Sequence, residues 1–340
     1  MINKVQKFIQ KEKLLPRDAK IIIGLSGGMD SMVLLDLLIL LGYRCMAAHC
    51  NFHLRGDESD RDAEFVRKWC KSTDVPFESI DFDTTGYAED RKISIEMAAR
   101  ELRYEWFKTL CKQYEADVIA VAHQKDDSVE TVLLNLIRGT GIKGLTGISP
   151  KNGLIVRPLL CVSREEIEEY IAKRDIPYVT DSTNNQDIYV RNYLRLNIIP
   201  KLEVINPSVK ESILRTSQNV SEAEKIYSGS IKESIEKIFS DNKINISLLK
   251  KVASPQSVLF EFLSPLGFSA STIEDIYQSM DSIPGKLFFS ENYRLIKDRL
   301  YFILEQINND PERDDYFLIE KDTNEIKSPI HLLFREENIP

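Results

Sequence analysis

The stretch from Ile21 to Leu41, IIIGLSGGMDSMVLLDLLILL, decides the fold of this chain. Its first five residues are apolar apart from one glycine and predict a short buried strand, while residues 32–38 have the composition of a helix. Between them lies the polar turn Ser26–Ser31, which contains two adjacent glycines. Because glycine has no Cβ, an anion can approach the backbone closely, and the first N–H groups of a helix are unpaired. The order of strand, glycine turn and helix therefore predicts a site for phosphate or pyrophosphate.

A plainer interpretation of the turn is a strand–helix connection in which glycine serves the geometry and Ser or Asp caps the helix. The complete string Ser-Gly-Gly-x-Asp-Ser favours function instead. It is neither a Walker A loop nor a dinucleotide fingerprint, because it lacks the Gly-Lys-Ser/Thr ending and the third glycine. It resembles the pyrophosphate loop (PP-loop) of the ATP pyrophosphatases. That resemblance implies cleavage of ATP between its α- and β-phosphates, with AMP placed on a substrate oxygen.

Length, charge and cysteine content narrow the class of protein. A chain of 340 residues with 43% hydrophobic residues suits two or three domains. No apolar run approaches the roughly 20 residues that cross a bilayer, and no signal-peptide core is evident, so we expect a cytoplasmic protein with no membrane contact. The five cysteines form no CxxC pair, which argues against a disulfide framework or a zinc ribbon. A net charge of −8 argues against a generally basic coat protein for nucleic acid but allows a local basic face.

Apolar strands alternate with helices from residue 21 to residue 138. Further strands are predicted at residues 44–49, 76–82 and 117–122, and helices at residues 59–71, 94–112 and 127–138. This alternation predicts an α/β fold with a parallel, doubly wound, Rossmann-like sheet. Ligands bind such sheets at the C-terminal ends of the strands, where Ser26, His49 and His123 are expected to meet.

We predict four parts along the chain. They are a PP-loop catalytic domain at 1–207, a helical connector at 208–242, a small C-terminal α+β domain at 243–310, and at 311–340 the start of a further C-terminal module, which is either shortened or small. Smaller features are also predicted: a first helix that Pro16 ends, a helix over 189–199 that Pro200 stops, short helices over 244–278, a hairpin at 287–304, and strands at Tyr316–Ile319 and Ile330–Phe334.

Two groups of charged residues are candidates for the site: one on a predicted helix and one that follows a predicted strand. Glu96, Arg100 and Arg103 share one helical face, either as a solvated ion pair or as guanidinium groups aimed at a phosphate. Residues 122–131 read AHQKDDSVET. Here Asp127 could cap the helix with Glu130 completing a capping box. Asp126 has no capping role in that arrangement, and the three carboxylates predict a Mg2+ site that would also use phosphate oxygens.

A polar segment from His49 to Arg55, HCNFHLR, follows the second strand. It could be a plain loop, but two histidines, an asparagine and an arginine at a strand end favour a place in the site. Zinc would need further ligands at short spacing, which the segment lacks.

Taken together, these strings resemble those of the tRNA(Ile)-lysidine synthetases. The matching segments are Ser26–Ser31, His49–Arg55, Glu96–Tyr104, Ala122–Thr131, Arg138–Ile148, Arg157–Leu160, Asp181–Asn184 and Arg191-Asn192. The first string marks the superfamily, and the glycine-rich string and the Asp-Ser-Thr-Asn/Arg-Asn pair are characteristic of this family. The chain departs from the family at Gln124, where a second histidine is usual, and in its short C-terminus.

The resemblance implies a two-step ligation on the wobble cytidine of the CAU anticodon of tRNA(Ile). The cytosine O2 attacks the α-phosphate of ATP, and free L-lysine then displaces AMP from C2. It also implies roles for the residues. ATP would be held by Ser26, Gly27, Gly28, Met29, Asp30, Ser31, His49 and Asn51, and Mg2+ by Asp30 with Asp126 or Asp127. Arg100 or Arg103 would stabilise the transition state, and Asp127, Glu130 or His123 would bind or deprotonate lysine. The RNA and lysine would contact His53, Arg55, Gly139, Thr140, Gly141, Asp181, Arg191 and Asn192. The resemblance also implies that the domain at 243–310 contacts tRNA and that the protein forms a homodimer.

Two other functions are kept open. The first is a tRNA cytidine thiolase of the same superfamily, a chemistry that usually needs CxxC cysteines, which are absent from this chain. The second is a non-catalytic regulator that uses the turn only to sense ATP, and the carboxylates and arginines near the turn argue against it.

Overall fold

The first part of the chain is built on a six-stranded sheet. The structure is a computed structural model, and it describes residues 1–180 and 190–307 together with the backbone of 325–326 and 332–333. The strand order is β3-β2-β1-β4-β6-β5. These strands are Phe77–Asp81, Arg44–Asn51, Lys20–Gly24, Val118–Ala120, Ile155–Val156 and Lys151–Asn152. All neighbours pair in parallel except β5, which runs antiparallel to β6. The predicted α/β fold with a mainly parallel sheet is confirmed.

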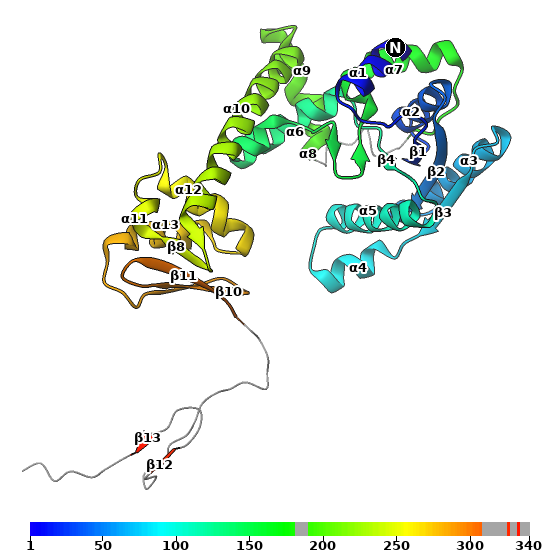
Figure 1. The fold of residues 1–340 in the computed structure, drawn as a ribbon. Helices are drawn as coiled ribbons and strands as arrows, with labels where there is room; N and C mark the ends of the chain where they lie inside the picture. The colour runs from blue at the N-terminus through cyan, green and yellow to red at the C-terminus, as the bar shows by residue number, and fades with distance from the viewer. Residues whose placement is uncertain (181–189, 308–324, 327–331, 334–340) are drawn as a thin grey trace, which may run out of the picture. The chain divides into compact units, whose positions relative to one another are not determined.

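Helices cover both faces of this sheet (Figure 1). The α-helices of this part of the chain, not all of which contact the sheet, are α1 (Ile2–Lys11), α2 (Met29–Leu40), α3 (Asp57–Ser72), α4 (Thr84–Arg91), α5 (Ile95–Gln113), α6 (Lys125–Arg138), α7 (Arg164–Arg174), α8 (Val190–Tyr193) and α9 (Ile199–Ile205). Side chains of β1 alternate between two cores, as the pleat requires. Ile21 and Ile23 pack with α1, α2, α3 and α7, whereas Ile22 packs with Phe107 and Leu110 of α5.

Helix α2 is apolar on almost every side because it is buried on almost every side. Leu34, Leu35, Leu37 and Leu38 have no exposed surface. The charged residue of its middle turn, Asp36, accepts hydrogen bonds from Tyr170 at 2.6 Å and from Arg174 at 2.9 Å on α7. This burial fixes the N-terminus of α2, which follows the glycine turn.

A second compact unit follows the first, and the division falls between Ile226 and Tyr227 inside α10 (Val209–Ile238). Its antiparallel sheet has the order β7-β8-β11-β10-β9. The elements are β7 (Phe239–Ser240), β8 (Lys243–Asn245), α11 (Ile246–Leu249), α12 (Pro255–Leu263), α13 (Ala270–Gln278), β9 (Leu287–Phe289), β10 (Tyr293–Lys297) and β11 (Tyr301–Gln306). Helices and sheet share a core around Leu295 and Phe302, and β10 and β11 form the predicted hairpin. The four-part division expected from the sequence stays a prediction.

Several predicted element ends were wrong. Helix α1 ends at Lys11, before Pro16, because Lys13 adopts a left-handed backbone with φ of 50°. Pro200 does not stop its helix: a π-helical turn over Leu194–Ile198 precedes it, and Pro200 lies in the first turn of α9, where its missing N–H costs nothing. At the C-terminus, β13 (Leu332–Leu333) pairs with β12 (Glu325–Ile326), while Tyr316–Ile319 lies outside the described residues.

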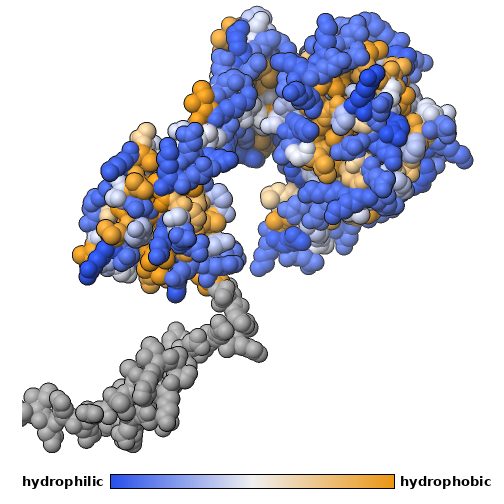
Figure 2. Space-filling view, in the orientation of Figure 1, coloured by the Kyte–Doolittle hydropathy of each residue, from blue (hydrophilic) through white to orange (hydrophobic). Residues whose placement is uncertain are grey.

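No helix among the described residues is long and apolar enough to cross a membrane. The face drawn in Figure 2 is mainly hydrophilic, with hydrophobic residues scattered over it.

The core around α2 gives a direct stability test. Leu37→Ala leaves a cavity at a fully buried position, so we expect the free energy of unfolding to fall by about 2–5 kcal/mol. Leu40→Ala, on the same helix but with 47% of the residue exposed, should cost less than about 1 kcal/mol. Both tryptophans, Trp69 and Trp106, lie in the first unit, so urea unfolding followed by tryptophan fluorescence measures that unit alone. Equal losses in the two variants would contradict the burial of α2.

Candidate active site

Three hydrogen bonds within the glycine turn hold its shape between β1 and α2. Ser31 Oγ accepts from Ser26 Oγ at 3.2 Å and donates to the Gly28 carbonyl at 2.9 Å, and the Gly28 N–H donates to Ser26 Oγ at 3.3 Å. Gly28 is the N-cap of α2, and no side chain caps this helix. The N-terminal N–H groups of α2 therefore remain available to an anion.

Gly27 is required by its backbone and by its neighbours. Its φ is +86°, a conformation that side chains disfavour. A Cβ there would lie 3.0 Å from methyl groups of Val66 and Val179. The Val179 N–H donates to the Gly27 carbonyl at 3.0 Å, so the segment Tyr178–Thr180 is fixed against the turn.

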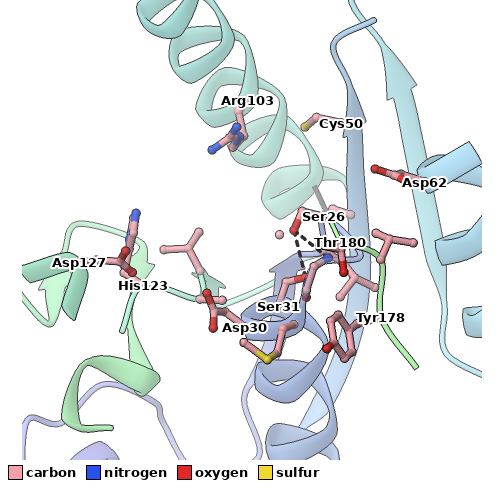
Figure 3. Close-up of a pocket in the computed structure, with 18 of the residues that line it drawn as sticks. Ser26, Asp30, Ser31, Cys50, Asp62, Arg103, His123, Asp127, Tyr178 and Thr180 are labelled. Atoms are coloured by element: carbon pink, nitrogen blue, oxygen red, sulfur yellow. Dashed lines mark hydrogen bonds between the residues drawn. The ribbon is translucent and has the colours of Figure 1, made fainter. Parts of the chain in front are cut away.

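A cavity of about 540 Å³ opens at this turn (Figure 3). Its volume lies within the range of roughly 300–1,000 Å³ typical of small-molecule sites. Ser26, Ser31 and Asp30 come from the turn and α2, Asp127 and His123 from the start of α6, and Arg103 from α5. The remaining polar lining comes from Arg55, Asp62, Tyr104, Arg164, Glu168, Tyr178, Thr180 and Arg195. Residues from three strand ends thus meet in one cavity, as the parallel sheet predicted.

Asp30 and Asp127 are two of the carboxylates that line this cavity, and burial disfavours the charged form of both. Asp30 Oδ1 is buried and has no hydrogen-bond partner among the described residues. Burial, followed by the charge of Asp127, raises the pKa of Asp30 to about 6. Burial also raises the pKa of Asp127, whose Oδ1 lies 3.7 Å from Arg195. An orphaned oxygen beside a second carboxylate fits a hard divalent cation that also takes phosphate oxygens.

Asp126, the third carboxylate expected at a Mg2+ site, does not line this cavity. Its Oδ1 lies 2.9 Å from Lys210 and its Oδ2 accepts from the Arg164 N–H at 3.0 Å. Within the described residues, no cluster of three His, Cys, Asp or Glu side chains could hold a metal ion. Neighbouring residues on a helix point about 100° apart, and here Asp127 is directed to the cavity while Asp126 is directed to Lys210.

The cap of α6 also differs from the expectation. Gln124 is the N-cap: its side chain accepts from the Asp126 N–H at 2.8 Å, and Asp127 accepts from the Gln124 N–H at 2.8 Å. Asp127 therefore completes the capping box instead of starting it, because the helix begins two residues earlier than predicted. Glu130 lies inside the helix and has only 1% of its surface exposed. Arg195 donates to its Oε1 at 2.7 Å, and Glu130 does not line the cavity.

His123 lines the cavity as a neutral ring. Arg157 Nε donates to its Nδ1 at 3.1 Å. Burial, then the charge of Arg157, lowers the pKa of His123 to about 3. With Nδ1 accepting, the ring proton lies on Nε2, and His123 is a hydrogen-bond donor and a weak base.

The two candidate arginines of α5 are separated by the structure. The Arg103 guanidinium lies 5.2 Å from the centre of the Phe52 ring and lines the cavity. Arg100 is exposed, lies 5.0 Å from the centre of the Tyr104 ring and is not part of the lining.

Strand β2 presents a different face to the cavity from the one expected. The lining residues are Ala48, Cys50 and Phe52, whereas His49 and Asn51 point to the opposite side of the sheet. His49 Nδ1 hydrogen-bonds the Leu25 carbonyl at 2.8 Å, and Asn51 donates to Asp60 at 2.8 Å. The direct ATP contacts implied for these two polar residues therefore do not fit the structure, and the strand alternation was the signal that could have shown this.

The remaining implied substrate residues are spread around the cavity. Arg55 lines it and pairs with Asp62 at 3.0 Å, while His53 is outside the lining and its Nε2 lies 2.9 Å from Asp81. The other members are outside the lining: Gly139 is the C-cap of α6, Thr140 and Gly141 follow it, and Arg191 and Asn192 lie on α8. Asp181 lies outside the described residues. Sequence reasoning missed Arg164, Glu168 and Tyr178–Thr180, which reach the cavity only through tertiary packing.

The sheet order, the glycine turn and the cavity together define a PP-loop protein. Residues 1–202 match the family model described as a PP-loop domain, and residues 240–307 match a TilS substrate binding domain. The tRNA(Ile)-lysidine synthase of Parabacteroides distasonis is 46% identical over 99% of this chain and 76% of its own. That of Bacteroides thetaiotaomicron is 50% identical over 91% and 73%. The chain belongs to the tRNA(Ile)-lysidine synthase family.

A solved structure with the same fold is the U34-tRNA thiolase NcsA from Methanococcus maripaludis with its [4Fe-4S] cluster. It aligns with a TM-score of 0.55 at 20% identity and covers 65% of this chain and 78% of that one. This likeness concerns the fold alone.

The raised pKa of Asp30 predicts a stability change with a defined sign. The native carboxyl holds its proton more tightly than the unfolded one, so the free energy of unfolding falls as pH rises from about 4 through about 6. Above that range the carboxylate is ionised in both the folded and the unfolded state, and the full free-energy cost of burying its charge destabilises the fold. Asp30→Asn should therefore raise the Tm of the ligand-free protein at pH 7.5 by roughly 3 °C or more, with a smaller gain at pH 4.5.

Asp36→Asn is the matched control on the same helix. It removes a carboxylate that accepts from Tyr170 and Arg174, so it should lower the Tm. An unchanged or lower Tm for Asp30→Asn at pH 7.5 would contradict the uncompensated burial of Asp30.

Proposed function

We propose that this chain ligates free L-lysine to C2 of the wobble cytidine in the CAU anticodon of tRNA(Ile), converting ATP to AMP and pyrophosphate. One observation carries the proposal: a single cavity brings together the glycine turn, the Asp30–Asp127 pair and Arg103. The names of the relatives, which align with most of the chain, support the same activity.

In the first step, the β- and γ-phosphates of ATP would lie against Ser26, Gly28, Ser31 and the N-terminus of α2. The cytosine O2 attacks the α-phosphorus, and the bond to pyrophosphate breaks. Arg103 would stabilise the negative charge of this transition state. Asp30 and Asp127 would hold Mg2+, which neutralises charge on the leaving pyrophosphate.

The adenine would take the apolar part of the cavity. Ala48, Cys50, Phe52, Phe107 and Val121 form this wall beneath Arg103. Gly24 adjoins it, and a Cβ there would lie 3.0 Å from the Phe107 ring, so the glycine lets strand β1 approach α5.

In the second step, the lysine ε-nitrogen attacks C2, the C2–O bond breaks and AMP leaves. The attacking ammonium must first lose a proton. Once pyrophosphate and its Mg2+ have left after the first step, Asp127 would be free to accept this proton, because it lines the cavity and burial raises its pKa. Glu130 is already bonded to Arg195, and the pKa of His123 near 3 makes it a poor base, so His123 would donate from Nε2 instead.

The target base must leave the anticodon loop to reach this cavity. Arg55 in the cavity lining, with His53, Gly139–Gly141, Arg191 and Asn192 outside the lining, would contact the RNA. A homodimer stays an expectation from the family. Neither alternative function gains a specific observation, since all five cysteines are free thiols and Cys50 in the cavity has a pKa raised by burial to about 12.

The decisive experiment measures pyrophosphate release by the purified protein with unmodified tRNA(Ile), L-lysine and ATP. We expect release that depends on the tRNA, formation of AMP, and incorporation of labelled lysine into one nucleoside of the tRNA detected by mass spectrometry. Asp30→Ala should abolish release while leaving tRNA affinity near wild type. Formation of ADP, or equal pyrophosphate release without tRNA, would overturn the proposal.

Arg103 and Arg100 give a matched pair on one helix. Arg103→Ala should lower kcat by about 10²–10³-fold, as for loss of a group that stabilises transition-state charge. Arg100→Ala should keep kcat within about threefold, because Arg100 does not line the cavity. Steady-state kinetics of pyrophosphate release compare the two. A larger loss in Arg100→Ala would reverse the assignment.

A further inference from the structure

A pair of crossed ion pairs joins the first two residues of α6 to α10. Asp126 Oδ1 lies 2.9 Å from Lys210, and Lys125 Nζ lies 3.2 Å from Glu211. On α6 the basic residue Lys125 precedes the acidic residue Asp126. On α10 the basic residue Lys210 likewise precedes the acidic Glu211. Exchanging the two residues on either helix would therefore place like charges together.

Asp126 and Lys210 are the more enclosed of these pairs. Only 11% of the Asp126 side chain is exposed, against 57% of the Glu211 side chain. Lys210 also lies 3.4 Å from Glu203 on α9 and 3.6 Å from Glu165 on α7. Burial alone would lower the pKa of Lys210, but the hydrogen bond and charge of Asp126 outweigh it and raise that pKa. Lys210 thus stays charged and links four helices.

The second oxygen of Asp126 holds the start of α7. Its Oδ2 accepts from the backbone N–H of Arg164, the first residue of that helix. The Arg164 side chain lines the active-site cavity, and so does Asp127, the residue after Asp126. The buried carboxylate of Asp126 therefore fixes the backbone at Asp127 and Arg164, which supply charge to the cavity, although Asp126 does not line the cavity itself.

The same part of α10 is held at a second point. Ser217 of α10 is only 4% exposed and lies against Gly147. A Cβ on Gly147 would approach Ser217 Oγ at 2.9 Å and Ser128 Oγ of α6 at 2.5 Å. Gly147 thus lies between Ser128 of α6 and Ser217 of α10, and this second link is about two helical turns along α10 from Lys210.

We propose that Asp126 is a positioning residue, which together with Lys210 of α10 fixes the first turns of α6 and α7 so that Asp127 and Arg164 face the reacting groups. This inference rests on the proposed ligase function. It replaces the expectation from the sequence that Asp126 is a ligand for Mg2+.

The test compares Asp126→Asn and Lys210→Met in the full chain with wild type, using kcat and KM for ATP in pyrophosphate release. We expect each variant to lower kcat at least tenfold while KM for ATP and the Mg2+ concentration for half-maximal rate stay within threefold. Lys210→Arg should restore kcat to within threefold of wild type. The kcat of the double variant should lie within about twofold of the kcat of the slower single variant, because both substitutions remove the same ion pair.

Lys4→Met is the control. It removes a 2.7 Å ion pair with Glu166 that also holds α7 but does not involve α6, and it should leave kcat within twofold of wild type. Thermal unfolding checks each variant, and Lys210→Gln replaces Lys210→Met if the latter does not fold.

The inference is overturned if Lys210→Met and Lys210→Gln keep more than half of kcat. It is also overturned if Asp126→Asn alone loses activity with a tenfold rise in the Mg2+ requirement, as expected of a metal ligand. A wild-type protein without tRNA-dependent release would instead remove the proposed function, so the two failures are distinguishable.

Discussion

The structure depends on the backbone at Gly27. The left-handed turn there lets β1 end and α2 begin within a few residues, and it is sealed by Val66 on one side and Val179 on the other. Because α2 is buried on nearly all sides, the position of its N-terminus is set by the core and not by a capping side chain. The free N–H groups that an anion needs are therefore held in place by hydrophobic packing before any ligand arrives, so that binding need not order them.

The charges around the cavity follow from the same preorganisation. Arg103, Arg164 and Arg195 come from three different helices, and Asp30 and Asp127 face them from two others. In the ligand-free protein Asp30 is buried, and one of its oxygens has no hydrogen-bond partner among the described residues, so its pKa is raised. Functional sites commonly carry such a cost in stability, because charges arranged for a reacting complex are not arranged for the empty protein. His123 illustrates the other outcome: among arginines it stays neutral and contributes a hydrogen bond without adding charge.

Much of the fold and the centre of the site could be predicted from local patterns. The alternation of strands and helices gave the parallel sheet, and the string at residues 26–31 located the phosphate turn, because both depend on residues adjacent in sequence. The errors arose where a side chain's direction decides its role. His49 and Asn51 are polar, but strand β2 turns them away from the cavity and presents Ala48 and Cys50 to it. The segment Tyr178–Thr180 carries no motif and reaches the turn only because the chain returns to Gly27.

The dipeptide Asp126-Asp127 shows that the roles of two identical residues cannot be assigned until the direction of each side chain on its helix is known. From the sequence the two residues are chemically equivalent, and either could serve a metal. On α6 they diverge: Asp127 closes the capping box and enters the cavity, whereas Asp126 is neutralised by Lys210 and the Arg164 N–H outside it. A buried carboxylate with a full set of partners contributes through the geometry it fixes, since removing one partner would leave a charge uncompensated. The two adjacent residues therefore have different tasks: Asp127 acts in the cavity, and Asp126 holds the helices whose residues line it.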